Sequence, residues 1–166
     1  MRELVEFLKA RFFEDEDFAR WAADYRSRPN GGPDLSGDER WQWVDAGNGR
    51  RLRLGRRPMD HLQGPVEMRS INEYPLRSRP GFGPHHVLSV SYVKEGVALH
   101  VARHSPARVV AEVQVKRRLL GMHAQVDDFG RCQACGESVG NGGCTTLRLL
   151  ATPYADHPAY RREWWI

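Results

Sequence analysis

Cysteine is scarce in this chain of 166 residues: there are three, all between positions 132 and 144. Three thiols cannot all pair within one chain, so the sequence excludes a small secreted domain held together by disulfides. Two of them form the pair Cys132-x-x-Cys135, and eight residues separate Cys135 from Cys144. This usage suits a reducing compartment and a bound metal, and we therefore expect a cytoplasmic protein.

Long apolar runs are also absent, since no segment approaches the ~20 residues that span a bilayer. The first helical segment turns acidic at residues 14–17, unlike a secretory signal, so we expect no membrane partner. Hydrophobic residues still make up 40% of the chain. That fraction and this length predict one domain over residues 1–166 with a real core.

Lysine is rare as well, with 3 residues against 22 arginines, and the net charge of +4 is a weak basic signal. Arginine in place of lysine throughout is typical of a high-GC genome. Five arginines nevertheless fall within eight residues: Arg50, Arg51, Arg53, Arg56 and Arg57. They are compatible with a nucleic-acid-binding ribbon that contacts phosphates, but the sequence favours the solvated face of a hairpin.

The motifs of the common enzyme classes are missing. There is no Walker A loop, no G-x-G-x-x-G, no G-x-S-x-G elbow and no H-E-x-x-H helix. His61, His85 and His86 lack carboxylates at ligand spacing, so we interpret them as strand-edge residues rather than a catalytic metal site. The sequence favours a non-enzymatic protein over the alternative, an enzyme of unrecognised class with its site in residues 60–95.

Helices are predicted at both ends of the chain. Apolar spacing predicts a helix over residues 3–26, with a bend or break at the acidic run 14–17. A short helix ends near His104, and a longer one begins at Pro106, with Ser105 as its N-cap. A further helix is predicted over residues 145–151, and Pro153 prevents it from continuing. The apolar chain end, Trp164 to Ile166, is expected to pack on the body.

Strands are predicted in the middle. Residues 41–54 read as a hairpin around a type I′ turn at Asn48-Gly49, which places Trp43 opposite Leu54 and Asp45 opposite Leu52. Trp43 and Leu52 would then lie on the packed face of the hairpin and Val44 on the solvent-exposed face. Further strands are expected at 64–72 and 87–93.

The fold class expected is therefore α+β. It has an N-terminal helix at 3–26, a β-rich insert at 27–95 that contains a small antiparallel sheet, and a helical zinc-knuckle part at 96–166.

A fourth metal ligand must join the three cysteines. Cys132 and Cys135 form a knuckle followed by Gly136, and Cys144 opens a helix after a glycine turn. His123 lies at a helix end, separated by eight residues from Cys132, and completes a closed tetrahedral zinc site. His104, His157, Asp127 and Asp128 are poorer candidates for the fourth ligand. Free structural thiols and a redox pair are the alternatives to zinc.

Three stretches of the chain resemble a known family: HVARHSPARVVAEVQVKRRLLGMH, the CxxCG knuckle, and CTTLRLLATPYADHPAYRREW. The family consists of uncharacterised small proteins of actinobacteria and their phages. Its members typically carry a His-Asp-Pro-Ala-Arg helix start, a Cys-Pro-x-Cys and a tail LRLLALPYADHPDYREEW. The resemblance covers residues 3–25 and 98–165, with Ser105 where Asp is usual and Gln133-Ala134 inside the knuckle.

The resemblance implies a metal knuckle and an actinobacterial or phage setting, and no activity. We accordingly expect a zinc-stabilised binding or regulatory protein, an accessory factor of a phage or mobile element. Its partner would be a host protein or a nucleic acid, between which the sequence does not decide.

Overall fold

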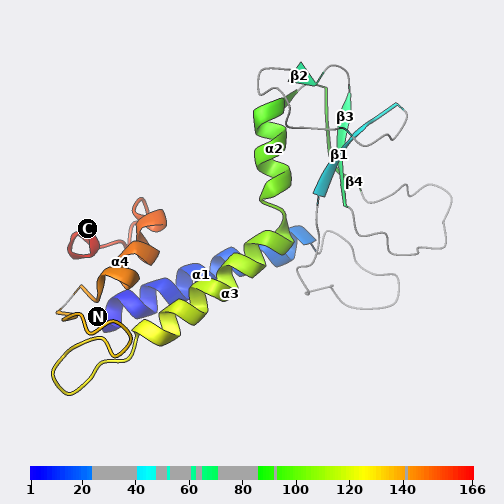
Figure 1. Ribbon diagram of the computed structural model, residues 1–166. Coiled ribbons are helices and arrows are strands. Elements are labelled where there is room, and N and C mark those ends of the chain that lie inside the picture. Colours follow the sequence, from blue (N-terminus) through cyan, green and yellow to red (C-terminus); the bar gives the residue numbers. More distant parts are fainter. Residues whose placement is uncertain are drawn as a thin grey trace. The chain divides into compact units, whose positions relative to one another are not determined.

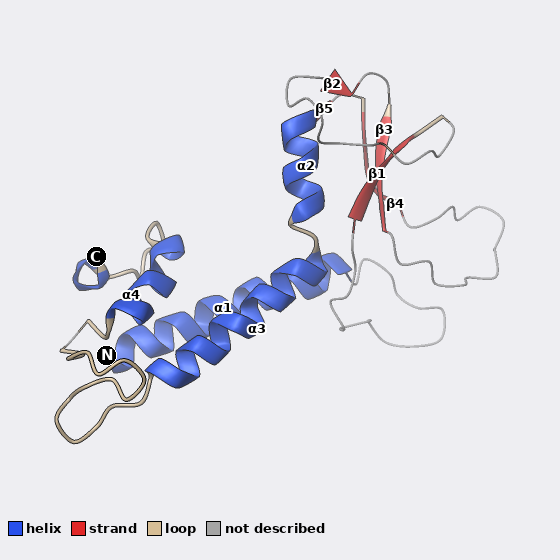
Figure 2. Ribbon diagram, viewed as in Figure 1, coloured by secondary structure: helices blue, strands red, loops and turns tan. Residues whose placement is uncertain are grey.

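The computed structural model describes residues 1–23, 41–47, 52, 61–62, 65–70, 86–91, 93–140 and 142–166. Its elements in chain order are α1 (Arg2–Ala23), β1 (Trp41–Asp45), β2 (His61–Leu62), β3 (Val66–Ser70), β4 (His86–Val90), β5 (Val93–Lys94), α2 (Glu95–Arg103), α3 (Pro106–His123), α4 (Thr145–Ala151) and the 3-10 turns η1 (Thr152–Tyr154) and η2 (Arg162–Trp164). Helices and a small antiparallel sheet coexist, so the expected α+β class is confirmed (Figures 1 and 2).

The chain divides into two compact units, which we describe separately. The first consists of Met1–Phe18 and Ala111–Ile166, and the second of Ala19–Val110. A single domain over residues 1–166 stays a prediction. No helix in the described ranges combines the length and the apolar character needed to cross a membrane.

Helix α1 runs unbroken through its acidic stretch, so the bend or break expected at residues 14–17 is wrong. The acidic side chains are compensated by α3: Asp15 contacts Lys116 at 3.4 Å, and Glu16 forms an ion pair with Arg117. Figure 1 shows the two helices side by side and antiparallel. Charges that interrupt the apolar stripe therefore pair between helices.

The core of the first unit is built from one face of each helix. Leu4, Leu8 and Phe12 of α1 are fully buried, as are Val113 of α3 and Leu147 of α4. The spacing of four residues between Leu4, Leu8 and Phe12 gives α1 one continuous apolar face. Each such side chain contributes about 1.5–3 kcal/mol on burial, so this face is what holds the helices together.

The C-terminal tail is attached through aromatic packing on Phe7. The rings of Tyr154, His157, Tyr160 and Trp164 have centroids 4.9–6.3 Å from that of Phe7. Trp164 is 1% exposed, whereas Trp165 and Ile166 are exposed. The expectation that the chain end packs on the body is therefore correct for Trp164 and wrong for Ile166. Trp165 packs only in part, since its ring lies edge-to-face on Tyr160 at 6.0 Å but stays exposed.

The second unit contains a three-stranded antiparallel sheet in the order β1-β3-β4. Strand β1 pairs with β3, from Trp41 opposite Ser70 to Asp45 opposite Val66. A separate two-stranded pair joins β2 to β5. The strands expected at 64–72 and 87–93 are thus present, as β3 and β4.

The register expected for the 41–54 hairpin is wrong where the described residues test it. Leu52 N–H donates to the carbonyl of Trp43 at 2.9 Å, so Leu52 lies opposite Trp43 and not Asp45. Because the shift is two residues, Leu52 keeps the face it shares with Trp43. The turn Asn48-Gly49 and Leu54 lie outside the described residues.

Val44 also departs from expectation: it was expected on the solvent-exposed face but is only 2% exposed. Trp43 and Val44 point to opposite faces of β1 and are both buried, so both faces of this strand are covered there. The core of the unit is the cluster of Trp43, Val66, Met68 and Ala98. Trp43 Nε1 donates to the carbonyl of Ala98 at 2.8 Å, which ties β1 to α2.

Candidate metal centre

His123 is the last residue of α3. The final helical turn is completed by the bond from Ala124 N–H to the carbonyl of Leu120 at 2.9 Å. Leu120 is buried and holds the helix end against the core. The imidazole is thus presented from a rigid element, as the sequence predicted.

The segment after His123 folds back on itself through two short bridges, Val126 with Cys132 and Arg131 with Ser138. Its tip is fixed by Asp127, whose Oδ1 accepts the N–H groups of Phe129 at 3.0 Å and Arg131 at 2.7 Å. A carboxylate that bonds the backbone two and four residues on closes a tight turn. Backbone bonds therefore shape the approach to Cys132.

The knuckle itself is a turn of five residues. The carbonyl of Cys132 accepts Gly136 N–H at 2.7 Å, and Cys132 N–H donates to the carbonyl of Glu137 at 2.8 Å. Gly136 has φ +71°, a left-handed conformation that glycine adopts at little cost. The glycine predicted to close the knuckle turn occupies that position.

Cys144 arrives from the other side, directly before α4. The preceding glycine turn brings Gly143 N–H to the carbonyl of Val139 at 2.7 Å. Glu137 links this point to the knuckle, because its carboxylate accepts Thr145 N–H at 2.9 Å and Thr145 Oγ1–H at 2.6 Å. These hydrogen bonds hold the pKa of Glu137 below its usual value, with a smaller contribution from Arg148.

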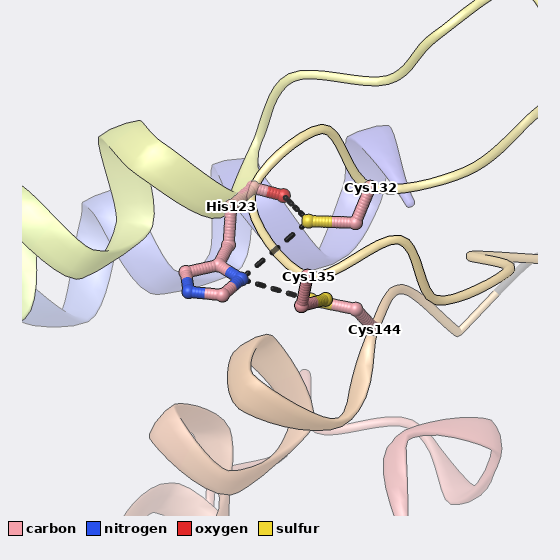
Figure 3. A group of neighbouring side chains, drawn as sticks. All are labelled: His123, Cys132, Cys135 and Cys144. Atoms are coloured by element: carbon pink, nitrogen blue, oxygen red, sulfur yellow. Dashed lines mark hydrogen bonds between the residues drawn. The ribbon is translucent and has the colours of Figure 1, made fainter.

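The four side chains converge on one point. The ligand atoms of His123, Cys132, Cys135 and Cys144 all lie within 4.8 Å of one another. Nδ1 of His123 is 3.5 Å from Sγ of Cys132 and 3.6 Å from Sγ of Cys144 (Figure 3). With zinc distances of about 2.3 Å to sulfur and 2.0–2.1 Å to nitrogen, a tetrahedral ion separates S and N by about 3.6 Å.

Two of the donor separations therefore match a tetrahedral metal ion, and all four donors lie close enough together to hold one. Three cysteines and a histidine form a soft donor set that suits zinc better than calcium or magnesium.

The two buried thiols differ in acidity. Burial opposes ionisation of Cys132, but the N–H groups of Cys135 and Ala134 and the neighbouring thiols outweigh it and lower its pKa. Burial raises the pKa of Cys144 to about 11, and the charges of Cys132 and Cys135 add to the effect. Such crowding of thiolates is relieved by a bound cation.

The other candidates for the fourth ligand are engaged elsewhere. Nδ1 of His104 contacts the carbonyl of His100 at 2.8 Å. Nε2 of His157 contacts Arg11, and its Nδ1 accepts Ala159 N–H at 3.1 Å. Asp127 supports the turn described above, and Asp128 is exposed. Among the described residues, His123 is the histidine that meets the cysteines.

Most of the remaining predicted site residues lie where the structure is not described. All five arginines of the basic cluster, Arg50, Arg51, Arg53, Arg56 and Arg57, lie outside the described residues, as does His85. His61 and His86 belong to strands of different sheets. The sequence did not predict the role of Glu137, which accepts hydrogen bonds from Thr145 at the start of α4. The available signal was an acidic residue close to the knuckle, followed by a helix that begins with threonine, because acidic groups cap helix N-termini.

The fold and the cluster define a small α+β protein with three cysteines and a histidine placed to hold a metal ion. The chain belongs to DUF6221, a family of unknown function whose model matches residues 1–166. No curated protein and no solved structure matches the chain.

Proposed function

We propose that this protein is a zinc-stabilised, non-enzymatic binding or regulatory protein of the reducing cytoplasm. One zinc ion is held by His123, Cys132, Cys135 and Cys144. The observation that carries the proposal is the spacing of the donors, since the S–N separations of 3.5 and 3.6 Å match those of a tetrahedral zinc ion.

A structural role is favoured over a catalytic one because four protein ligands complete the shell and leave no position for water or substrate. The ligands come from the end of α3, the knuckle and the start of α4. Zinc would therefore cross-link segments with little apolar surface of their own: Phe129, the largest hydrophobic side chain between His123 and Cys144, is 85% exposed. The free energy of metal binding then contributes directly to folding.

Elemental analysis of protein purified without added metal tests the zinc site. We expect about one equivalent of zinc in the native chain, as four soft ligands imply, and loss of most of it in Cys132→Ser. The matched control is Asp128→Asn, which alters an exposed carboxylate of the same segment and should retain the metal. A native chain without metal, or zinc kept by Cys132→Ser, contradicts the proposal.

The biological setting that we propose is that of an accessory factor of a phage or mobile element, which engages a host protein or a nucleic acid. Its support is the sequence resemblance and the run of arginines at positions 50–57. Arginine forks bind phosphate with two hydrogen bonds, so such a run suits nucleic acid. Gel mobility shifts at two salt concentrations distinguish the two partner classes, because phosphate contacts weaken with salt.

If nucleic acid is the partner, part of the affinity resides in the arginine run. Replacing Arg50, Arg51 and Arg53 by glutamine should flatten the slope of log K against log salt by about two to three units. The control replaces Arg2, Arg108 and Arg118, which are exposed and lie outside the run, in the same way. An unchanged slope, or no binding at low salt, assigns the partner to the protein class.

A further inference from the structure

The three thiols of the cluster differ in their access to solvent. Cys132 and Cys144 are 0% exposed, whereas Cys135 is exposed. All three sulfur atoms nevertheless lie within 4.8 Å of one another. A soluble oxidant therefore reaches Cys135 before the other two residues, and their sulfur atoms lie within 4.8 Å of its own.

This exposure follows from the local fold. Cys132 is enclosed by the return of the chain, since its N–H and carbonyl bond to Glu137 and Gly136. Cys144 is fully buried directly before α4, where a Cβ atom built on the preceding Gly143 would meet Leu4 and Leu147. Cys135 is at the outer corner of the knuckle turn, so the difference in access is built into the backbone.

We propose that Cys135 is a site of oxidation by peroxides, and that its reaction with Cys132 releases the metal. This inference rests on the zinc site proposed above. Susceptibility of a thiolate to oxidation follows its exposure, and a neighbouring thiolate resolves the first product.

The reaction balances with peroxide as the oxidant. The thiolate of Cys135 attacks hydrogen peroxide, the O–O bond breaks, an S–O bond forms, and hydroxide leaves, which gives a sulfenic acid. The thiolate of Cys132 then attacks that sulfur and expels a second hydroxide, which forms the disulfide. In sum, two thiolates, one peroxide and two protons give one disulfide and two waters.

The metal loses two of its four ligands in this reaction, and His123 and Cys144 alone do not hold it. The cross-link between the end of α3 and the start of α4 is then gone. The bond of Glu137 to Thr145 remains as the direct connection from the knuckle to α4. Oxidation would thus loosen the segment from 124 to 144 and the start of α4 without unfolding α1 or α3, and reduction would restore it.

The test begins with zinc-loaded protein whose metal content has been measured, so absence of zinc at that step refutes the proposed function before peroxide is added. Peroxide is then added in the presence of dimedone, which traps sulfenic acids, and the adducts are located by peptide mass spectrometry. We expect the adduct at Cys135. Without dimedone, we expect a disulfide between Cys132 and Cys135 and release of one zinc per chain, followed with a chromogenic chelator.

The decisive variant is Cys135→His, because histidine is also a zinc ligand but cannot be oxidised in this way. Zinc release by peroxide should be slower than in the native chain by about tenfold or more. Equal release from the two proteins overturns the inference. So does an adduct at Cys132 or Cys144 in the native chain, a result that does not depend on whether the variant binds zinc.

Discussion

Gly143 shows how closely the metal-binding turn approaches the helices. Its φ is +77°, and a Cβ atom built on it would lie 3.0 Å from Cδ2 of Leu4. Gly121, two residues before His123, has helical geometry and nothing within 4 Å of a Cβ atom. Gly143 is thus required by both its backbone conformation and its packing, whereas neither requires glycine at position 121.

The two alanine substitutions should therefore have opposite effects. Gly143→Ala should lower the free energy of unfolding by about 1–3 kcal/mol, because alanine is strained at positive φ and Leu4 must move. Gly121→Ala should raise it by up to about 1 kcal/mol, since alanine is the better helix former. Chemical denaturation of the metal-loaded proteins measures both. If both substitutions changed the free energy of unfolding in the same direction, the turn at Gly143 would not have the conformation and packing described.

At the level of elements, a polar network joins α1, α3 and η1. The hydroxyl of Tyr154 donates to Asp15 at 2.5 Å and accepts from Lys116 at 3.2 Å. Burial, followed by the hydrogen bond and the charge of Asp15, raises the pKa of Tyr154 well above its usual value. The tyrosine therefore stays neutral and serves as a structural bridge between an acid and a base.

Tyr154→Phe should destabilise the first unit by about 1–2 kcal/mol, because the variant loses a hydrogen bond to a charged carboxylate, which keeps only its longer contact with Lys116. Tyr160→Phe is the matched control: Tyr160 packs on the same Phe7 ring, and no hydrogen bond of its hydroxyl is found in the described part of the chain. The melting temperatures of the two variants give the comparison. Equal losses would mean that the network adds nothing beyond ring packing.

The tail motif that carries the family resemblance has a structural explanation at this level. Tyr154, His157, Tyr160 and Trp164 all surround Phe7, and Arg161 forms an ion pair with Glu3 near the start of α1. Burial of aromatic rings is a large stabilising term for a chain of this size. The motif is accounted for by attachment of the chain end to α1.

For the whole molecule, the two units differ in their dependence on metal. The cluster belongs to the first unit, whereas the second has its own apolar core of Trp43, Val66, Met68 and Ala98. A metal that cross-links a segment with little apolar surface stabilises that segment most. The two cores should therefore respond differently when the metal is removed.

Hydrogen exchange before and after chelation tests this expectation. Removal of zinc should speed amide exchange in residues 124–144 and in α4, while β1, β3 and β4 keep their protection. The strands provide the internal control in the same experiment. Loss of protection in strands and knuckle together would mean that the chain responds to the metal as a single cooperative unit.

The sequence by itself predicted the features that depend on neighbouring residues. Pro106 begins α3, Gly136 closes the knuckle, and α4 gives way to a 3-10 turn at Pro153, because each acts through its own backbone dihedrals. The cluster could also be anticipated, since its residues fall between positions 123 and 144 and short turns suffice to bring them together.

What only the tertiary structure decided depends on segments distant in sequence. The acidic run of α1 remains helical because Lys116 and Arg117, about a hundred residues away, supply opposite charges. The pairing of β1 with β3 and the burial of Val44 could not be read from the sequence. The residue pattern of a strand does not distinguish one with both faces covered from one that is half exposed. Exposure of Cys135 beside two buried thiols likewise results from how the chain encloses Cys132 and Cys144, since the three residues are chemically identical.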